Sequence, residues 1–323
     1  MATWMHNLDP FALQIGGGFG LRWYGLAYLA AFASAYLIYV HLAKRGCSVL
    51  PLNKVGDFIT GCAVFGVLVG GRLGFMLFYD FDGFVGDPLV FFRVWEGGMS
   101  AHGGILGVVI YTFWFAWRYN LNWPGLGDNL VVGVPLGLFF GRMANFINGE
   151  LYGRPSSVPW SVFFPKSVYQ LPVERQREVL LQSEQIVGRP VGLDQVVASV
   201  PESPRLAEML GSYLEARHPS QLYEAVLEGL FLFFLLWILR TRVRLANGVI
   251  TGMFFIGYAV LRSLAELFRE PDAGLVWGMT RGQFLSIFLV LIGLGFWIAA
   301  RWRPSYPPLW AKVSTKKQGD FKL

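Results

Sequence analysis

Long apolar stretches recur along the chain, and short segments that hold most of the polar residues separate them. Seven of these stretches approach the ~20 residues that an α-helix needs to cross a bilayer. The pattern therefore predicts an all-α polytopic membrane protein with seven transmembrane helices. The predicted spans are about Leu21–Leu42, Asp57–Tyr79, Ser100–Arg118, Asp128–Asn148, Gln221–Leu239, Gly248–Phe268 and Gly282–Trp302.

Two further segments do not fit a spanning helix. The segment Asp80–Gly98 is apolar but too short to cross, which predicts an interfacial or re-entrant helix on the outer side. The insertion from about Pro155 to Arg217 is rich in charged residues and predicts a small periplasmic subdomain. The predicted parts are helices one to four with an outer N-terminal segment (1–154), the subdomain (155–217), helices five to seven (218–303) and a basic cytoplasmic tail (304–323).

Composition and charge support this interpretation. The 323 residues are 54% hydrophobic and only 15% charged, against about 25% charged in soluble domains. Lys44, Arg118 and Arg240 lie just after odd-numbered spans, and more basic residues follow the seventh, so we expect the N-terminus outside and the C-terminus in the cytoplasm. The net charge of +6 therefore reflects topology and a lipid partner, not nucleic acid. Cys47 and Cys62 form neither a disulfide framework nor a metal pattern.

Glycines are concentrated in the second, third and fourth spans. They include Gly66, Gly70, Gly71, Gly74, Gly103, Gly104 and Gly107. Small residues at spacing such as Gly70-x-x-x-Gly74 let membrane helices approach closely. We therefore expect these glycines to pack helix against helix.

One polar run, Gly141–Arg154, begins inside an apolar span. Ionised side chains at bilayer depth cost a few kcal/mol, so they are rare and usually mark a site. Glycines, among them Gly149 and Gly153, interrupt the run, as expected where a helix ends or backbones approach closely. The polar members are Arg142, Asn145, Asn148, Glu150 and Arg154.

Other polar residues lie at the starts of odd spans and the ends of even spans, which the predicted topology places in the outer half of the membrane. They include Tyr24, His102, His218, Tyr258, Arg262 and Glu266. Arginine presents a planar fork of donors that matches a phosphate, so two arginines at headgroup depth indicate an anionic phospholipid. A histidine nearby can transfer protons near neutral pH. Together these residues predict an outer cavity for group transfer from a lipid.

The run Gly141–Arg154 closely resembles the signature of the phosphatidylglycerol–prolipoprotein diacylglyceryl transferase family of bacteria. Further stretches resemble the same family, in its order and over most of the chain; the insertion Ser156–Glu215 is the part least covered. They are Trp23-Tyr24-Gly25-Leu26, Phe92–Ser100, His102–Gly107, Arg217–Glu224 and Phe268–Asp272.

The resemblance implies an enzyme of the bacterial inner membrane that catalyses the first step of lipoprotein maturation. It moves the diacylglyceryl group of phosphatidylglycerol to the thiol of the lipobox cysteine of a prolipoprotein and releases glycerol phosphate. The partners are then phosphatidylglycerol, prolipoprotein signal peptides and the bilayer, with no cofactor and no metal. The nucleophile is the substrate's cysteine, which needs a base or a positive field because the thiolate is the reactive form.

On this interpretation Arg142 and Arg262 hold the phosphate and stabilise the leaving group, and His102 helps to deprotonate the thiol. The other predicted site residues orient the headgroup and the arginines or form the rim towards the lipoprotein. They are Tyr24, Asn145, Asn148, Glu150, Gly153, Arg154, Tyr258 and Glu266.

Alternatives remain open from the residues alone. His102 beside two glycines is also compatible with a packing histidine, and Arg262 with Glu266 with a structural ion pair. Arg72 in the second span could pair with a carboxylate or a carbonyl instead of substrate, and Tyr24 could anchor the interface. A transporter would also carry intramembrane charges, but no repeat between the halves supports one. Another lipid enzyme would need a serine or cysteine nucleophile with a base, or a metal cluster, and the sequence offers no clear one.

Overall fold

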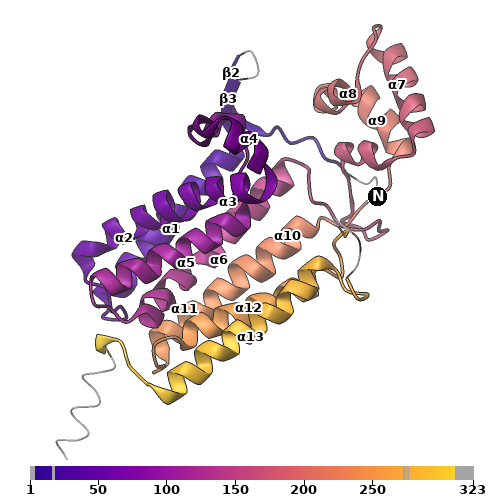
Figure 1. Ribbon diagram of the computed structural model, residues 1–323. Coiled ribbons are helices and arrows are strands. Elements are labelled where there is room, and N and C mark those ends of the chain that lie inside the picture. Colours follow the sequence, from indigo (N-terminus) through magenta and orange to yellow (C-terminus); the bar gives the residue numbers. More distant parts are fainter. Residues whose placement is uncertain (1–3, 17–18, 272–273, 275, 310–323) are drawn as a thin grey trace, which may run out of the picture. The chain divides into compact units, whose positions relative to one another are not determined.

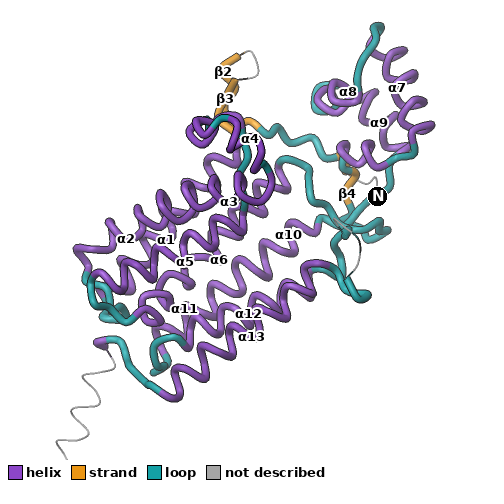
Figure 2. The backbone as a smooth tube through the Cα atoms, viewed as in Figure 1, coloured by secondary structure: helices purple, strands orange, loops and turns teal. Residues whose placement is uncertain are grey.

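Helices dominate the structure, a computed structural model that describes residues 4–16, 19–271, 274 and 276–309 (Figure 1). Figure 2 shows how few strands accompany them: in these ranges there are four, all short. They are β1 (Trp4–Met5), β2 (Phe11–Gly16), β3 (Phe19–Arg22) and β4 (Val162–Phe163). The predicted basic tail lies largely at 310–323, outside the described residues.

A helix lies at each of the seven predicted spans. Five continuous helical stretches among the described residues are long and apolar enough to cross a membrane, and α12 is a shorter apolar helix. The protein is therefore a helical membrane protein. The five stretches are α1 (Trp23–Lys44); η1 (Leu52–Lys54) with α2 (Val55–Gly61), η2 (Cys62–Val69) and α3 (Gly70–Tyr79); α6 (Trp123–Ile147); α10 (Ser220–Glu224) with η6 (Ala225–Phe231) and α11 (Leu232–Arg242); and α13 (Arg281–Trp302). The other two predicted spans correspond to α5 (Ala101–Arg118) and α12 (Val249–Ala265).

The chain forms two compact units. Unit 1 comprises Met1–Ala30, Pro135–Leu232 and Gly257–Val290. Unit 2 comprises Ala31–Val134, Phe233–Ile256 and Leu291–Leu323.

In unit 2, glycines bring the η2–α3 stretch and α5 into backbone contact. A Cβ atom on Gly70 would lie 2.7 Å from the carbonyl oxygen of Gly103, and one on Gly74 would lie 2.5 Å from the Cα atom of Gly103. No side chain fits at these distances. The expected helix packing through glycines is therefore confirmed.

Gly103→Ala should destabilise the protein, because the new methyl group would lie 2.5 Å from the Gly70 carbonyl oxygen and 2.7 Å from the Gly74 Cα atom. Overpacking of this kind costs about 1–3 kcal/mol. Gly104→Ala is the matched control, since its nearest neighbour, the Val67 carbonyl oxygen, is 3.7 Å away. Thermal unfolding in detergent micelles measures both. Equal midpoints for the two variants would contradict the glycine contact.

Unit 2 also contains a buried polar network. Arg240 is 2% exposed and pairs with Asp128 at 3.2 Å, and it donates to Asn129 Oδ1 at 2.7 Å. Asp128 further accepts from the backbone N–H groups of Gly248 and Thr251. The network joins α6, α11 and the start of α12, so these intramembrane charges hold helices together.

The segment Asp80–Gly98, all of whose residues the structure describes, consists of short helices and contains no membrane-spanning helix. They are α4 (Phe81–Gly86), η3 (Pro88–Phe92) and η4 (Val94–Glu96). Arg72 fastens this segment to α3: it is 3% exposed and donates to the carbonyl oxygens of Phe91 and Gly98 at 3.1 Å and of Arg93 at 3.0 Å, and also to those of Val90 and Gly97. The carbonyl alternative for Arg72 is thus confirmed.

In unit 1, the insertion folds around a small core of its own. It contains η5 (Pro165–Gln170), α7 (Val173–Val187), α8 (Leu193–Ser199) and α9 (Pro204–Tyr213). Buried residues from each of these helices meet, among them Val168, Val179, Val196 and Leu210. Strand β4 pairs in parallel with β1, which ties the N-terminal segment to the insertion.

Candidate functional site

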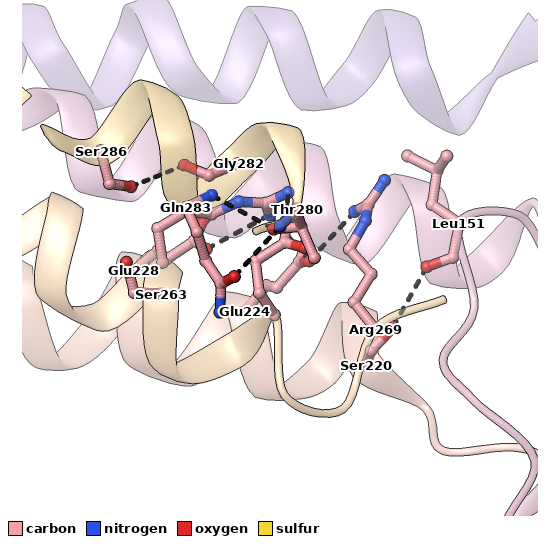
Figure 3. Close-up of polar contacts among 12 residues, drawn as sticks. Leu151, Ser220, Glu224, Glu228, Ser263, Arg269, Thr280, Gly282, Gln283 and Ser286 are labelled. Atoms are coloured by element: carbon pink, nitrogen blue, oxygen red, sulfur yellow. Dashed lines mark hydrogen bonds and ion pairs between the residues drawn. The ribbon is translucent and has the colours of Figure 1, made fainter. Parts of the chain in front are cut away.

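Six charged side chains in unit 1 form one connected group, which we call the arginine–carboxylate cluster. Its members come from α6, the α10–η6 junction, α12 and the segment that follows α12, and Figure 3 shows the Arg269 side chain pointing toward Glu224. The cluster consists of Arg142, Arg262, Arg269, Glu224, Glu228 and Glu266.

Glu224 is the centre of the cluster. Its side chain is fully buried, and its two oxygens lie 2.7 Å from Arg142 Nε, 2.8 Å from an Arg262 nitrogen and 3.0 Å from an Arg269 nitrogen. Three guanidinium groups thus converge on one carboxylate. Ion pairs of this kind offset the large cost of burying each charge alone.

Arg262, in the last turn of α12, and Glu266, directly after that helix, form an ion pair with each other. Gly282 makes room for it, because a Cβ atom there would lie 2.5 Å from Glu266 Oε1. Tyr258, one turn before Arg262, interacts electrostatically with Arg142, Arg262 and both glutamates of the α10–η6 junction. The predicted residues Arg142, Tyr258, Arg262 and Glu266 therefore lie together.

A second polar group surrounds Glu150. Tyr24, at the start of α1, donates to Glu150 Oε1, and the Asn145 side chain donates both to Tyr24 and, at 3.1 Å, to Glu150. The backbone oxygen of Glu150 accepts from Gln221 Nε2 at 2.7 Å. Because Gln221 lies one turn before Glu224, the end of the signature run is held next to the helix that carries the central carboxylate.

The last residues of the signature run are fixed through the backbone. The N–H of Gly153 donates to the His218 carbonyl at 2.9 Å, and the N–H of Arg154 donates to the Phe268 carbonyl at 2.9 Å. A Cβ atom on Gly153 would lie 2.3 Å from the Phe268 oxygen, so only glycine fits. Arg154 Nε donates to the Arg269 carbonyl. Asn148 has a buried Oδ1 with no hydrogen-bond partner among the described residues.

His6 contacts the same run where α6 ends. It is 5% exposed, its Nε2 lies 2.7 Å from the Phe146 carbonyl oxygen, and its ring stacks on Phe164. Gly149, with φ +62°, lies against the His6 ring, since a Cβ atom there would be 3.1 Å from the nearest ring atom. Burial lowers the pKa of His6, and the nearby charge of Lys166 lowers it further, against the hydrogen bond to Phe146.

This lowered pKa predicts a pH dependence. As the pH falls, His6 is protonated in the unfolded chain near its ordinary pKa of 6.5, and in the folded chain only at lower pH. The contribution of neutral His6 to the free energy of unfolding is therefore present above pH 6.5 and is lost as the pH falls below that value. We expect the Tm of the wild type to fall more steeply from pH ~7 to ~5 than that of His6→Gln, which cannot titrate. Equal slopes in a thermal unfolding series would contradict this role.

His102 belongs to unit 2, in the first turn of α5. Ser100 caps that helix by accepting from the N–H of Gly103 at 3.2 Å, and the exposed His102 side chain lines a shallow pocket with Phe75, Tyr79 and Met99. Its position relative to the arginine–carboxylate cluster stays a prediction.

Sequence reasoning missed three members of the cluster. Glu224 and Arg269 stood in stretches that resemble the family but received no role, and Glu228 was not singled out. A signal did exist: Glu228 is an ionisable residue inside an apolar span, and it shares a helix face with Glu224 four residues earlier. His218, one of the polar residues that the predicted topology placed in the outer half, lies just before α10, and its Nδ1 is 3.1 Å from the Tyr223 hydroxyl oxygen.

Comparison with known proteins identifies the family of the chain. A family model described as prolipoprotein diacylglyceryl transferase matches residues 10–299. The chain is 38% identical over 315 residues to the phosphatidylglycerol–prolipoprotein diacylglyceryl transferase of Marinomonas sp. (strain MWYL1), covering 96% of this chain and 98% of the relative. It is 40% identical over 328 residues to the protein of that name from Bdellovibrio bacteriovorus, with 90% and 92% covered. The chain therefore belongs to the prolipoprotein diacylglyceryl transferase family.

Proposed function

We propose that this protein transfers the diacylglyceryl group of phosphatidylglycerol to prolipoproteins. The names of its relatives support the substrates and the transfer. One observation carries the proposal in this chain: Arg142 and Arg262, from different helices, converge on the buried Glu224 at 2.7 and 2.8 Å. Paired guanidinium groups with restrained orientation can bind a phosphodiester through several charge-assisted hydrogen bonds.

The placement in the membrane is part of the proposal. The protein lies in the bacterial inner membrane and crosses it seven times, with its N-terminus outside. This topology accounts for the basic residues that follow the odd-numbered spans. Residues 1–154 and 218–303 then supply the spans, residues 155–217 form a periplasmic subdomain, and 304–323 form a cytoplasmic tail. The core of α7–α9 supports an independently folded insertion.

The reaction balances as a substitution at carbon. The sulfur of the lipobox cysteine forms a bond to the glyceryl carbon, the bond from that carbon to the phosphate oxygen breaks, and its electron pair leaves with glycerol phosphate. Arg142 and Arg262 stabilise the charge that develops on the leaving phosphate. His102 accepts the thiol proton, which then passes to solvent.

The remaining residues position these groups. Tyr24 and Asn145 hold Glu150 towards the headgroup, and Glu266 and Tyr258 orient Arg262. Gly153 and Arg154 shape the rim, and we assign Asn148, whose buried Oδ1 has no hydrogen-bond partner among the described residues, to the headgroup.

The test uses the purified full-length protein in micelles with phosphatidylglycerol labelled in its diacylglyceryl glycerol. We expect label to pass to a lipobox peptide and not to the same peptide with Cys→Ser. A failure to label the cysteine peptide would overturn the proposed function. Equal labelling of both peptides would overturn the thiol as acceptor.

A further inference from the structure

Glu228 occupies an unusual place in the arginine–carboxylate cluster. Its side chain is fully buried, and it lies between the two arginines to which we assign the phosphate. One oxygen is 3.6 Å from an Arg142 nitrogen and the other is 3.5 Å from an Arg262 nitrogen. Both distances exceed those of normal charge-assisted hydrogen bonds, which are about 2.7–2.9 Å.

The contrast with Glu224 is informative. Glu224 makes ion pairs with three arginines at 2.7–3.0 Å, whereas the nearest nitrogens of Arg142 and Arg262 lie 3.6 and 3.5 Å from Glu228. A buried carboxylate without close partners costs free energy. Glu228 is therefore held in a position that its own contacts do not optimise.

The backbone at Glu228 is unusual as well. It lies in η6, a π-helical segment between α10 and α11, and π-helical segments are frequently found at functional sites. Gly229 packs against Phe139 of α6, where a Cβ atom would lie 2.7 Å from the Phe139 Cβ atom. The segment is thus fixed against the helix that carries Arg142.

The charges of the cluster balance without a ligand. Arg142, Arg262 and Arg269 contribute three positive charges, and Glu224, Glu228 and Glu266 contribute three negative charges. A phosphodiester adds one negative charge, whereas a phosphate monoester carries about −1.5 to −2 at pH 7. Transfer therefore raises the negative charge of the phosphate group bound next to Glu228.

We propose that Glu228 is a specificity-determining residue that competes with phosphate for Arg142 and Arg262. The monoanionic phosphodiester of the lipid displaces the Glu228 carboxylate from the two arginines. After transfer, Glu228 repels the more highly charged glycerol phosphate and pairs with Arg142 and Arg262 again. Glu228 thereby favours substrate over product. This inference rests on the proposed function and assigns to the same site a device for product release.

The test compares Glu228→Gln with Glu266→Gln. Both substitutions remove one negative charge beside Arg262 and keep the side-chain length. In the ion pairs of the cluster, however, Glu266 contacts Arg262, whereas Glu228 lies between Arg142 and Arg262. Transfer is measured at increasing glycerol phosphate, with inorganic phosphate as a second probe. For Glu228→Gln we expect the inhibition constant for glycerol phosphate to fall about tenfold or more, with lower KM and lower kcat.

The outcomes separate cleanly. Stronger product inhibition in Glu228→Gln than in Glu266→Gln supports the proposal, whereas an unchanged inhibition constant, or an equal fall in both variants, overturns it. If Glu228→Gln does not accumulate, Glu228→Met, uncharged and of similar length, carries the same comparison. The wild type tests the function itself: a wild type without cysteine-dependent transfer refutes the proposed function, independently of the variants.

Discussion

Replacing Arg142 with lysine should lower kcat/KM for diacylglyceryl transfer by about 10²–10³-fold, the usual loss when one charge-stabilising donor is removed. Lysine keeps the positive charge beside Glu224 but not the planar fork, and Arg142 Nε is the atom that lies 2.7 Å from Glu224. The guanidinium orientation that fits a phosphate is therefore lost, while the buried carboxylate keeps a cation. Transfer kinetics with labelled phosphatidylglycerol measure the effect.

Arg22→Lys is the matched control for this prediction. Arg22 is exposed and stacks on the Phe11 ring, away from the cluster contacts, so its replacement should leave transfer close to the wild-type rate. Near-normal transfer by Arg142→Lys would remove Arg142 from the phosphate site. Unfolding midpoints that match between Arg142→Lys and the wild type would show that the loss is in the chemistry.

Glu224→Gln should destabilise the protein by about 3–5 kcal/mol, the range found when one partner of a buried ion pair is removed. The three arginines that converge on Glu224 would then share two carboxylates in a buried cluster, and Arg269 would lose the carboxylate that it contacts at 3.0 Å. Chemical unfolding in mixed lipid–detergent micelles measures the free energy of unfolding.

Glu270→Gln provides the comparison, because its side chain is 40% exposed where it pairs with Arg217. An exposed pair contributes about 0–1 kcal/mol, so this variant should unfold close to the wild type. If Glu224→Gln unfolded as the wild type does, the central carboxylate would have no structural role. Loss of transfer in a Glu224→Gln protein that still folds would assign Glu224 to the orientation of the arginines.

The helices of this fold could be predicted well from the sequence. Hydropathy and the membrane thickness determine where helices lie, and a helix occupies each predicted span. Glycine spacing predicted a close helix contact, and the structure brings Gly70, Gly74 and Gly103 together. The polar run Gly141–Arg154 stood out because charge is rare at bilayer depth.

The partners of the charged residues were harder to predict, because pairing depends on which helices are neighbours. Arg72 donates only to backbone carbonyls in its described hydrogen bonds, and carbonyls carry no signal in a sequence. The two glutamates at the α10–η6 junction received no role for a related reason: the apolar span that holds them was interpreted from its average hydropathy. His6 lies 140 residues before its partner Phe146, so no local pattern joins them.

A structure of the protein with phosphatidylglycerol bound tests the central claim most directly. The claim is that Arg142 and Arg262, restrained by Glu224, hold the lipid phosphate. We expect non-esterified phosphate oxygens within about 3 Å of nitrogens from both guanidinium groups. A phosphate bound elsewhere, with both arginines still engaged only by their carboxylates, would contradict it.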